Sequence, residues 1–228
     1  MTNTTILKLI ELLEKNEKQE IKNILTLELL KEYKDKKSAN RLKTTQKYFK
    51  EMDDSRPILK TLMIRDNKKF ICNGYSLYVF LKDFNGIDSL PTTTENCLDI
   101  TQILPKGNFR ELDNDENLLL HNIKKYIDYV KATRPIENKK DEISIYINNR
   151  VFNAKLVLQC TEMLGNLDNL EILSNDDNCS GNIKIQPIQI KNDEVLGMVL
   201  PVRIFDEEKF NKIKETTETF IKRIKEGI

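Results

Sequence analysis

Residues 141–204 decide the fold class; they read DEISIYINNRVFNAKLVLQCTEMLGNLDNLEILSNDDNCSGNIKIQPIQIKNDEVLGMVLPVRI. The hydrophobic pattern of this stretch starts with the period of a strand, changes to that of a helix, and returns to short runs rich in Ile and Val. Asn153 is placed to cap the helix, which runs to Leu164, and Gly165 to stop it. The predicted strands are Ile143–Ile147, Leu170–Leu173, Ile183–Ile190 and Leu196–Ile204.

The preceding hundred residues show a similar alternation of helix and strand patterns. Turns are expected at Arg65–Lys68 and at Asn73-Gly74, because Asn-Gly tolerates a positive φ angle. Pro187 indicates an edge or a bulge in the strand that contains it. Helices are predicted at Arg41–Met52 and Asp115–Thr133, the second capped by Asp113 or Asn114, and strands at Ile58–Ile64, Lys69–Cys72, Leu77–Leu81 and, more weakly, Cys97–Ile103.

Both ends of the chain are predicted to be helical. Apolar residues recur at helical spacing over the first thirty residues, and Lys15-Asn16-Glu17 marks either a break between two helices or the middle of one. The polar segment Lys34–Asn40 is expected to be a linker or a helix end. Asp206 is placed to cap a closing amphipathic helix. Together these elements predict an α+β fold with mostly antiparallel connections.

Composition narrows the class of protein. The 228 residues include 37 basic and 36 acidic side chains, so the formal net charge of +1 provides no global field that would attract nucleic acid. Apolar residues make up 39% and charged residues 32%, which is typical of a folded globular chain. We expect a cytoplasmic protein without membrane contact, since no apolar run approaches the roughly 18 residues of a membrane span.

Few residues point to catalytic or metal chemistry. The four cysteines (Cys72, Cys97, Cys160 and Cys179) form no Cys-x-x-Cys pair and are expected to be structural thiols, although disulfides remain an alternative. The single histidine, His121, follows three leucines and is expected to be an ordinary helix residue. The glycines are isolated, so no phosphate-binding loop is present. We therefore predict a protein that is not an enzyme, with no cofactor, no metal and no small-molecule substrate.

The strand-and-helix blocks resemble one domain of the bacterial-type DNA sliding clamp, the ring-shaped processivity subunit of replicative DNA polymerase. Phe152-Asn153 stands where clamps begin a helix, and Leu200-Pro201-Val202-Arg203-Ile204 is similar to the end of a clamp domain. Further upstream, Gly74-Tyr75-Ser76-Leu77 stands at a clamp's turn between strands. The resemblance covers residues 41–205. The overall pattern is also similar to that of small phage-encoded proteins.

The resemblance implies a mostly antiparallel sheet backed by two helices, Arg41–Met52 and Asn153–Leu164. It implies three parts: an N-terminal helical arm (1–40), a clamp-like domain (41–205) with an inserted helix at about 115–133, and a C-terminal helix (206–228). Clamp chains carry two or three such domains, whereas this chain holds one. A ring would therefore need about six copies of it, joined through exposed edge strands.

In clamps, basic residues on the inner helices face DNA phosphates. The stretch Lys34–Lys50 has seven basic residues and one acid, and the resemblance makes six of them candidate DNA-binding residues: Lys36, Lys37, Arg41, Lys43, Lys47 and Lys50. Such a lysine-rich helix is also typical of a solvated surface. The second helix is less basic, with Lys155 offset by Glu162. A further cluster, expected to be ordinary surface, comprises Lys124, Lys125, Lys131, Arg134, Lys139 and Lys140.

Two functions stay open at this point. In the first, the chain is a non-enzymatic, clamp-like binding module associated with DNA replication or with a phage or mobile element. Such a module would contact double-stranded DNA or replication proteins and form homo-oligomers. Alternatively it is a protein-binding adaptor or inhibitor that uses the clamp fold as a scaffold and its N-terminal helices as an interaction arm. Fold alone does not decide between them, because one fold hosts unrelated functions.

Overall fold

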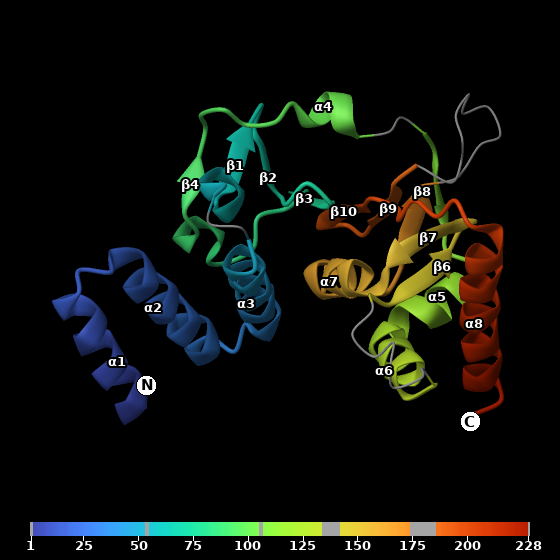
Figure 1. Cartoon of the computed structure of the whole chain (residues 1–228). Coiled ribbons are helices and arrows are strands. Elements are labelled where there is room, and N and C mark those ends of the chain that lie inside the picture. The colour runs from blue at the N-terminus through green and yellow to red at the C-terminus, as the bar shows by residue number, and fades with distance from the viewer. Residues whose placement is uncertain (1, 53–54, 105–106, 134–141, 174–185, 228) are drawn as a thin grey trace. The chain divides into compact units, whose positions relative to one another are not determined.

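The structure is a computed structural model, and it describes residues 2–52, 55–104, 107–133, 142–173 and 186–227. Figure 1 shows helices combined with mostly antiparallel strands, so the predicted α+β class is confirmed. The chain forms two compact units: the first comprises residues 1–73 and 79–100, and the second residues 74–78 and 101–228. These units do not coincide with the expected boundaries after residues 40 and 205.

Where the structure describes it, the first unit carries three α-helices and one end of a sheet. The break expected at Lys15-Asn16-Glu17 is confirmed, because Asn16 has a φ of 56° and separates two helices. Strand order in this unit is β4-β1-β2, with β1 antiparallel to β2 and parallel to β4. Its elements are α1 (Asn3–Glu14), α2 (Lys18–Glu32), α3 (Lys36–Lys50), η1 (Pro57–Lys60), β1 (Leu62–Arg65), β2 (Lys68–Cys72), the end of β3 (Ser76–Phe80), η2 (Ile87–Ser89) and β4 (Thr92–Thr93).

Local turns explain several boundaries in the first unit. The predicted turn between β1 and β2 is confirmed, since Asp66 and Asn67 adopt φ angles of 50° and 59°. Gly86, with a φ of 93°, brings the chain so close to α2 that an added Cβ would lie 2.8 Å from Cγ2 of Thr26. A glycine is therefore required where the loop before η2 meets α2.

In its described residues, the second unit combines a sheet, a separate hairpin and four longer helices. Its sheet has the order β10-β9-β8-β5 with antiparallel neighbours, and α7 packs against β10. The helix α8 packs on the hairpin β6-β7. Its elements are the start of β3, α4 (Ile100–Ile103), β5 (Phe109–Glu111), α5 (Asn114–His121), α6 (Ile123–Thr133), β6 (Ser144–Ile147), β7 (Arg150–Asn153), α7 (Ala154–Leu164), β8 (Glu171–Leu173), β9 (Ile188–Lys191), β10 (Val195–Val199) and α8 (Glu207–Lys225).

Three predicted caps and one predicted stop lie where the sequence places them. The Asn153 side chain accepts a hydrogen bond from the backbone N–H of Lys155 at the start of α7. The Asp206 side chain likewise accepts one from the backbone N–H of Lys209 at the start of α8. Asp113 caps α5, and Gly165 ends α7 with a φ of 73°. These signals act within one helical turn, which is why the sequence alone reveals them.

Two helix predictions need correction. The segment Lys34–Asn40 was predicted to be a linker or a helix end; α2 ends just before it, at Glu32, but most of the segment is helical, because Asp35 caps α3 and helix begins again at Lys36. The helix expected at Asp115–Thr133 is two helices, α5 and α6, separated at Asn122. The Asn122 side chain donates to the carbonyl of Leu118 at 2.9 Å, a local bond that competes with the helix backbone.

Several strand predictions were also wrong. Ile58–Ile64 begins as the 3-10 helix η1, which Pro57 starts, and only its end belongs to β1. Cys97–Ile103 contains the short helix α4 in place of a strand. The strand at Leu196–Ile204 ends at Val199, shortly before Pro201, which has no N–H to donate. The hairpin strand β7 was not predicted; Asn148 and Asn149, with φ angles of 49° and 61°, form its turn.

The interpretation of Pro187 as a residue of an edge strand was wrong as well. The strand β9 begins one residue after it and lies between β8 and β10, so it is not an edge strand. Residues 183–185 of the predicted strand lie outside the described residues. In the ranges that the structure describes, no helix is long and apolar enough to cross a membrane.

Candidate nucleic-acid interface

The helix α3 is amphipathic, and its polar face is strongly basic. Its buried face includes Leu42, Thr45 and Phe49, which pack within the first unit. The opposite face carries Lys36, Lys43, Lys47 and Lys50, all exposed. We call these four residues the lysine stripe.

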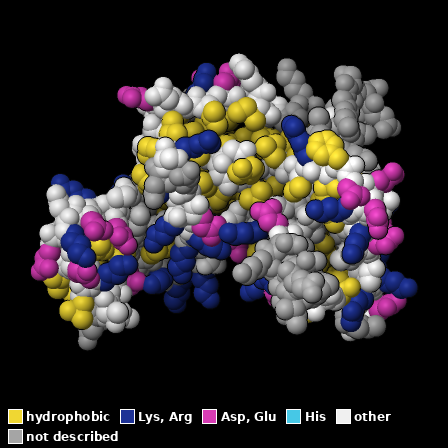
Figure 2. Space-filling view, in the orientation of Figure 1, with side chains coloured by type: hydrophobic (Ala, Val, Ile, Leu, Met, Phe, Trp, Pro, Cys, Tyr) yellow, Lys and Arg dark blue, Asp and Glu magenta, His cyan; other side chains and the backbone are white. Residues whose placement is uncertain are grey.

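Helical geometry places the members of the lysine stripe on one side. Positions i, i+7, i+11 and i+14 of an α-helix fall within a narrow arc, and 14 residues span about 21 Å. Asn40, which is also exposed, fills the gap in this arc, so no acidic side chain of α3 interrupts it. Figure 2 shows dark blue Lys and Arg side chains gathered where Figure 1 places α3.

The other two candidate residues lie off the lysine stripe. Arg41 is only 4% exposed, and its guanidinium lies over the ring of Phe84 at 5.9 Å from the centroid. Arg41 therefore packs inside the unit, and its assignment as a DNA-binding residue is corrected. Lys37 is exposed about a quarter of a turn from the stripe.

The N-terminus of α3 is fixed by a network around Asp35. Its carboxylate accepts from the backbone N–H of Ser38 at 3.0 Å and from Asn85 Nδ2 at 2.8 Å. These hydrogen bonds lower the pKa of Asp35, and the one from the Ser38 backbone contributes most. The cap holds the first turn of α3, and with it Lys36, in a defined position.

The remaining basic residues of the prediction do not join this stripe. Lys124, Lys125 and Lys131 are exposed on α6, in the second unit. Arg134, Lys139 and Lys140 lie outside the described residues. On α7, Lys155 and Glu162 are both exposed, so this helix presents no basic face of its own.

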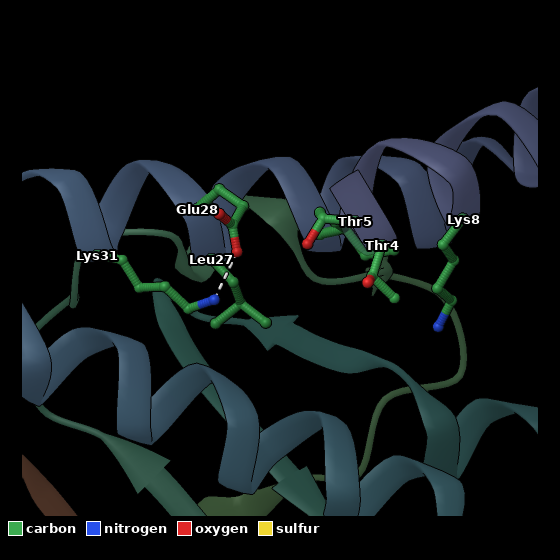
Figure 3. Close-up of a pocket in the computed structure, with 7 residues that line it drawn as sticks. Thr4, Thr5, Lys8, Leu27, Glu28 and Lys31 are labelled. Atoms are coloured by element: carbon green, nitrogen blue, oxygen red, sulfur yellow. Dashed lines mark hydrogen bonds and ion pairs between the residues drawn. The ribbon is translucent and has the colours of Figure 1, made fainter. Parts of the chain in front are cut away.

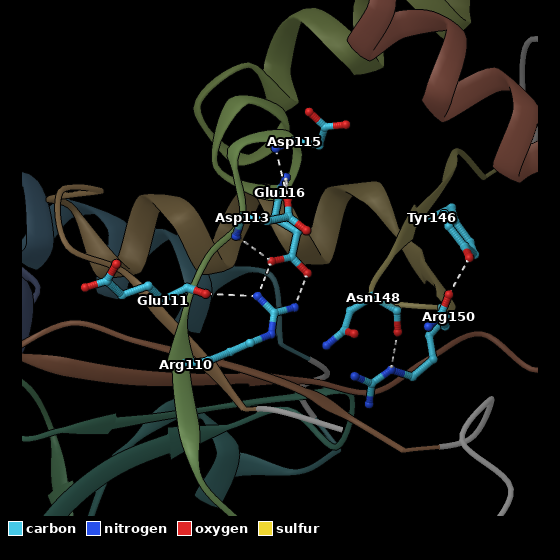
Figure 4. Close-up of polar contacts among 9 residues, drawn as sticks. Arg110, Glu111, Asp113, Asp115, Glu116, Tyr146, Asn148 and Arg150 are labelled. Carbon is cyan, nitrogen blue, oxygen red and sulfur yellow. Dashed lines mark hydrogen bonds and ion pairs between the residues drawn. The ribbon is translucent and has the colours of Figure 1, made fainter. Parts of the chain in front are cut away.

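Sequence reasoning missed a polar network in the second unit, drawn in Figure 4. Arg110 binds Glu116 through two N–H···O bonds of 2.7 Å, and this pairing raises the pKa of Arg110. Glu116 also accepts from the backbone N–H of Asp113 at 3.1 Å, which completes the capping box of α5. Only the Asp-x-x-Glu spacing of this box is visible in the sequence.

Arg150 is the most deeply buried basic residue of that network, at 2% exposure. Its guanidinium donates to the carbonyls of Asn148 at 3.1 Å, Gln186 at 3.1 Å and Pro187 at 3.0 Å. Burial lowers its pKa to about 10. This arginine ties the β6-β7 turn to the start of β9, and its buried, hydrogen-bonded position makes it a structural residue.

The described thiols and the single imidazole are placed as packing or surface residues. Cys72 and Cys160 are buried and Cys97 is half-buried, all three as free thiols, as predicted; Cys179 lies outside the described residues. Burial raises the pKa of Cys160 to about 12. His121 is exposed at the end of α5, where its Nδ1 lies 2.9 Å from the carbonyl of Asn117.

No protein-family model matches this sequence, and a search of curated proteins finds no significant match. The case for a function therefore depends on the geometry of the molecule.

Proposed function

We propose that this chain is a non-enzymatic DNA-binding module of the sliding-clamp type, which holds duplex DNA through the lysine stripe of α3. The observation that carries the proposal is the alignment of Lys36, Lys43, Lys47 and Lys50 on one exposed helix face. Such a row of ammonium groups matches a phosphate backbone, and phosphate contacts fix position without reading bases. Binding would then not depend on the base sequence of the DNA.

The second unit supports the clamp part of the proposal. The helix α7 is followed by three antiparallel strands, β8, β9 and β10, in the order that the resemblance implies. Val202, in the segment that resembles the end of a clamp domain, donates its N–H to the carbonyl of Val151 at 2.8 Å. A role in replication, in a phage or mobile element, and assembly into rings are parts of the same proposal.

Salt dependence is the property that identifies this mode of binding. Each phosphate contact releases a condensed counterion, and four contacts give a slope of about −3.6 in a plot of log K against log salt. Between 50 and 200 mM salt the affinity for duplex DNA should therefore fall roughly a hundredfold. The affinity should also be the same for unrelated duplexes of equal length.

A charge-reversal experiment tests the lysine stripe. Fluorescence anisotropy with a labelled duplex would be measured for the full chain and for the variant Lys43→Glu/Lys47→Glu/Lys50→Glu, which we expect to lose binding. The matched control is Lys124→Glu/Lys125→Glu/Lys131→Glu, which changes net charge equally on exposed positions of α6. Circular dichroism would verify that both variants are folded.

The two variants separate local from global electrostatics. If both bind as weakly as each other, only net charge matters and the assignment to α3 is wrong. If the α3 variant binds as tightly as the parent chain, the lysine stripe does not contact DNA. Light scattering of the parent chain adds the assembly state, since a ring requires about six copies.

The α1 helix favours a second candidate function, a protein-binding adaptor. Leu7 is 68% exposed, Ile10 49% and Leu13 64%, and they lie together on one face of α1. An exposed apolar helix face of this kind is typical of a protein-binding surface. Replacing Leu7 and Leu13 by Gln should abolish a protein complex while leaving duplex binding intact; a complex that survives the change excludes this face.

A further inference from the structure

A cavity of about 390 Å³ lies inside the first unit, where α1 and α2 meet α3. Its wall includes residues from all three helices, from η1 and from the chain after η2. The volume falls in the range of about 300–1,000 Å³ that is typical of small-molecule sites. The amino-acid sequence does not reveal this cavity, because its lining comes from segments that lie up to about eighty-three residues apart, from Lys8 to Pro91.

The lining combines three kinds of side chain. Lys8, Lys50 and Lys60 supply ammonium groups, Asn23 and Gln46 supply amides, and Leu27 is among the apolar residues. Ammonium groups bind anions, amides pair with the edges of heterocyclic bases, and aliphatic side chains cover the faces of a ring. A ligand that carries an anionic group, a heterocyclic base and a flat ring face would complement all three kinds of side chain.

The amide of Gln46 gives this cavity a specific polar feature. Among the described residues, Gln46 Nε2 is one of the few buried side-chain nitrogens without a hydrogen-bond partner. A buried donor left unpaired costs free energy, so each such group calls for an explanation. Nε2 is enclosed by protein atoms, so a ligand oxygen or ring nitrogen in the cavity would satisfy it once the amide turns about its soft terminal torsion.

The charges of the lining favour an anion. Glu20 is the one acid among the described residues of the lining, and it pairs with Lys8 at 3.3 Å. Against this single carboxylate stand three ammonium groups, so the described residues of the lining carry more positive than negative charge. The excess lies in a concave, partly apolar site, where an anion is screened less than on an open surface.

A smaller hollow nearby does not share this character. It has a volume of about 240 Å³, lies between α1 and α2, and shares Lys8, Ile24 and Leu27 with the larger cavity. Figure 3 shows that its other lysine, Lys31, is bound to Glu28. Its threonines, Thr4 and Thr5, offer no charge, so the larger cavity is the stronger candidate.

We propose that the larger cavity binds a nucleoside phosphate, with the lysines on the phosphate and Gln46 on the edge of the base. The ligand is either a free nucleotide or the terminal nucleotide of a nucleic-acid strand, since both present the same chemistry. The proposal does not require that α3 binds duplex DNA. Lys50 is the one residue common to the cavity and the lysine stripe.

Calorimetric titration of the full chain tests the proposal with three probes: adenosine 5′-monophosphate, adenosine and inorganic phosphate. We expect the monophosphate to bind, adenosine to bind at least tenfold more weakly, and inorganic phosphate to compete with the monophosphate. Absence of binding by the monophosphate up to about 5 mM would overturn the proposal. Equal affinity for adenosine and its monophosphate would overturn the role of the lysines.

Variants then locate the site. Gln46→Leu keeps a similar volume and removes the unpaired amide, so the fold should be retained while the monophosphate binds roughly tenfold more weakly. Lys50→Gln should have a comparable effect, whereas Lys43→Gln, on the same helix but outside the cavity, should have none. Unchanged affinity in both cavity variants would show that the ligand binds elsewhere.

A last titration distinguishes the two sources of the ligand. A single-stranded tetranucleotide with a 5′-phosphate should bind more tightly than the monophosphate and compete with it if the cavity receives a strand end. If the tetranucleotide does not compete, the ligand is a free nucleotide. Failure of duplex binding in the α3 experiment would leave these results unchanged, because Lys43→Gln separates the lysine stripe from the cavity.

Discussion

Gly197 lies where β10 packs against α7, and its replacement by Ala is a sharp test of the second unit. In β10 it pairs with Ile190 of β9, and a Cβ added to it would lie 2.5 Å from Sγ of Cys160. Cys160 is 1% exposed on α7, so its sulfur has little room to move. Normal contacts between such atoms are about 3.5–4.0 Å, so one side must shift by about 1 Å.

The magnitude follows from two opposing effects. Gly→Ala in a strand would by itself stabilise the fold by about 0.5–1 kcal/mol, because glycine loses more backbone entropy on folding. Overpacking in a well-packed core costs about 1–3 kcal/mol. We therefore expect Gly197→Ala to lower the free energy of unfolding by about 1–2 kcal/mol, with the packing effect dominant.

A double-mutant cycle with Cys160→Ala isolates the contact. Cys160→Ala alone should cost about 1 kcal/mol through the space it leaves, and in the double variant the new methyl group occupies that space. The free energy of unfolding would be measured by urea denaturation, monitored by circular dichroism. For the double variant it should exceed, by at least 1 kcal/mol, the value expected from adding the two single effects. Gly74→Ala is the control, since nothing lies within 4 Å of its Cβ position; its effect should add to that of Cys160→Ala. Additive effects at Gly197 would refute the close contact.

Two further predictions concern the cap of α3 and the buried thiol. Asp35→Ala should lower the free energy of unfolding at pH 7 by about 1 kcal/mol, measured by urea denaturation. The pKa of Asp35 is lowered in the folded state, so this stabilisation is present above about pH 4 and is lost as the pH falls through the folded pKa. The free energies of unfolding of parent and variant should therefore converge in acid. A difference between them that does not change with pH would contradict the role of the carboxylate. With its pKa raised to about 12, Cys160 should resist a disulfide reagent at pH 8 until the chain unfolds, whereas half-buried Cys97 should react in the folded state. Mass spectrometry of labelled peptides checks both thiols, and rapid native labelling of Cys160 would show that α7 opens freely.

Signals that act over a few residues made much of the fold predictable. Asn153, Asp113 and Asp206 cap helices because a side-chain oxygen needs only the backbone two or three residues ahead. The turn at Asp66-Asn67 likewise follows from the tolerance of these residues for a left-handed backbone. The error at Asn122 has the same local origin, because the break depends on whether its amide donates to the carbonyl of Leu118 or points to solvent.

The candidate site was only partly predictable. The charge of Lys34–Lys50 and its helical period are sequence properties, so the basic face of α3 was foreseeable. The exclusion of Arg41 was not, because its burial depends on Phe84, which lies more than forty residues away in the chain. The same holds for the unpaired amide of Gln46, whose surroundings include residues of α1 and α2.

The amino-acid sequence by itself determined the α+β class, most helix caps and the concentration of lysines before residue 50. The tertiary structure alone decided that β9 is an inner strand, that Gly197 leaves room for Cys160, and that Arg150 is buried among carbonyl groups. The physical reason is distance along the chain. Capping, turn geometry and helical period are set by neighbouring residues, whereas burial, close packing and cavities arise only when segments far apart in the sequence meet.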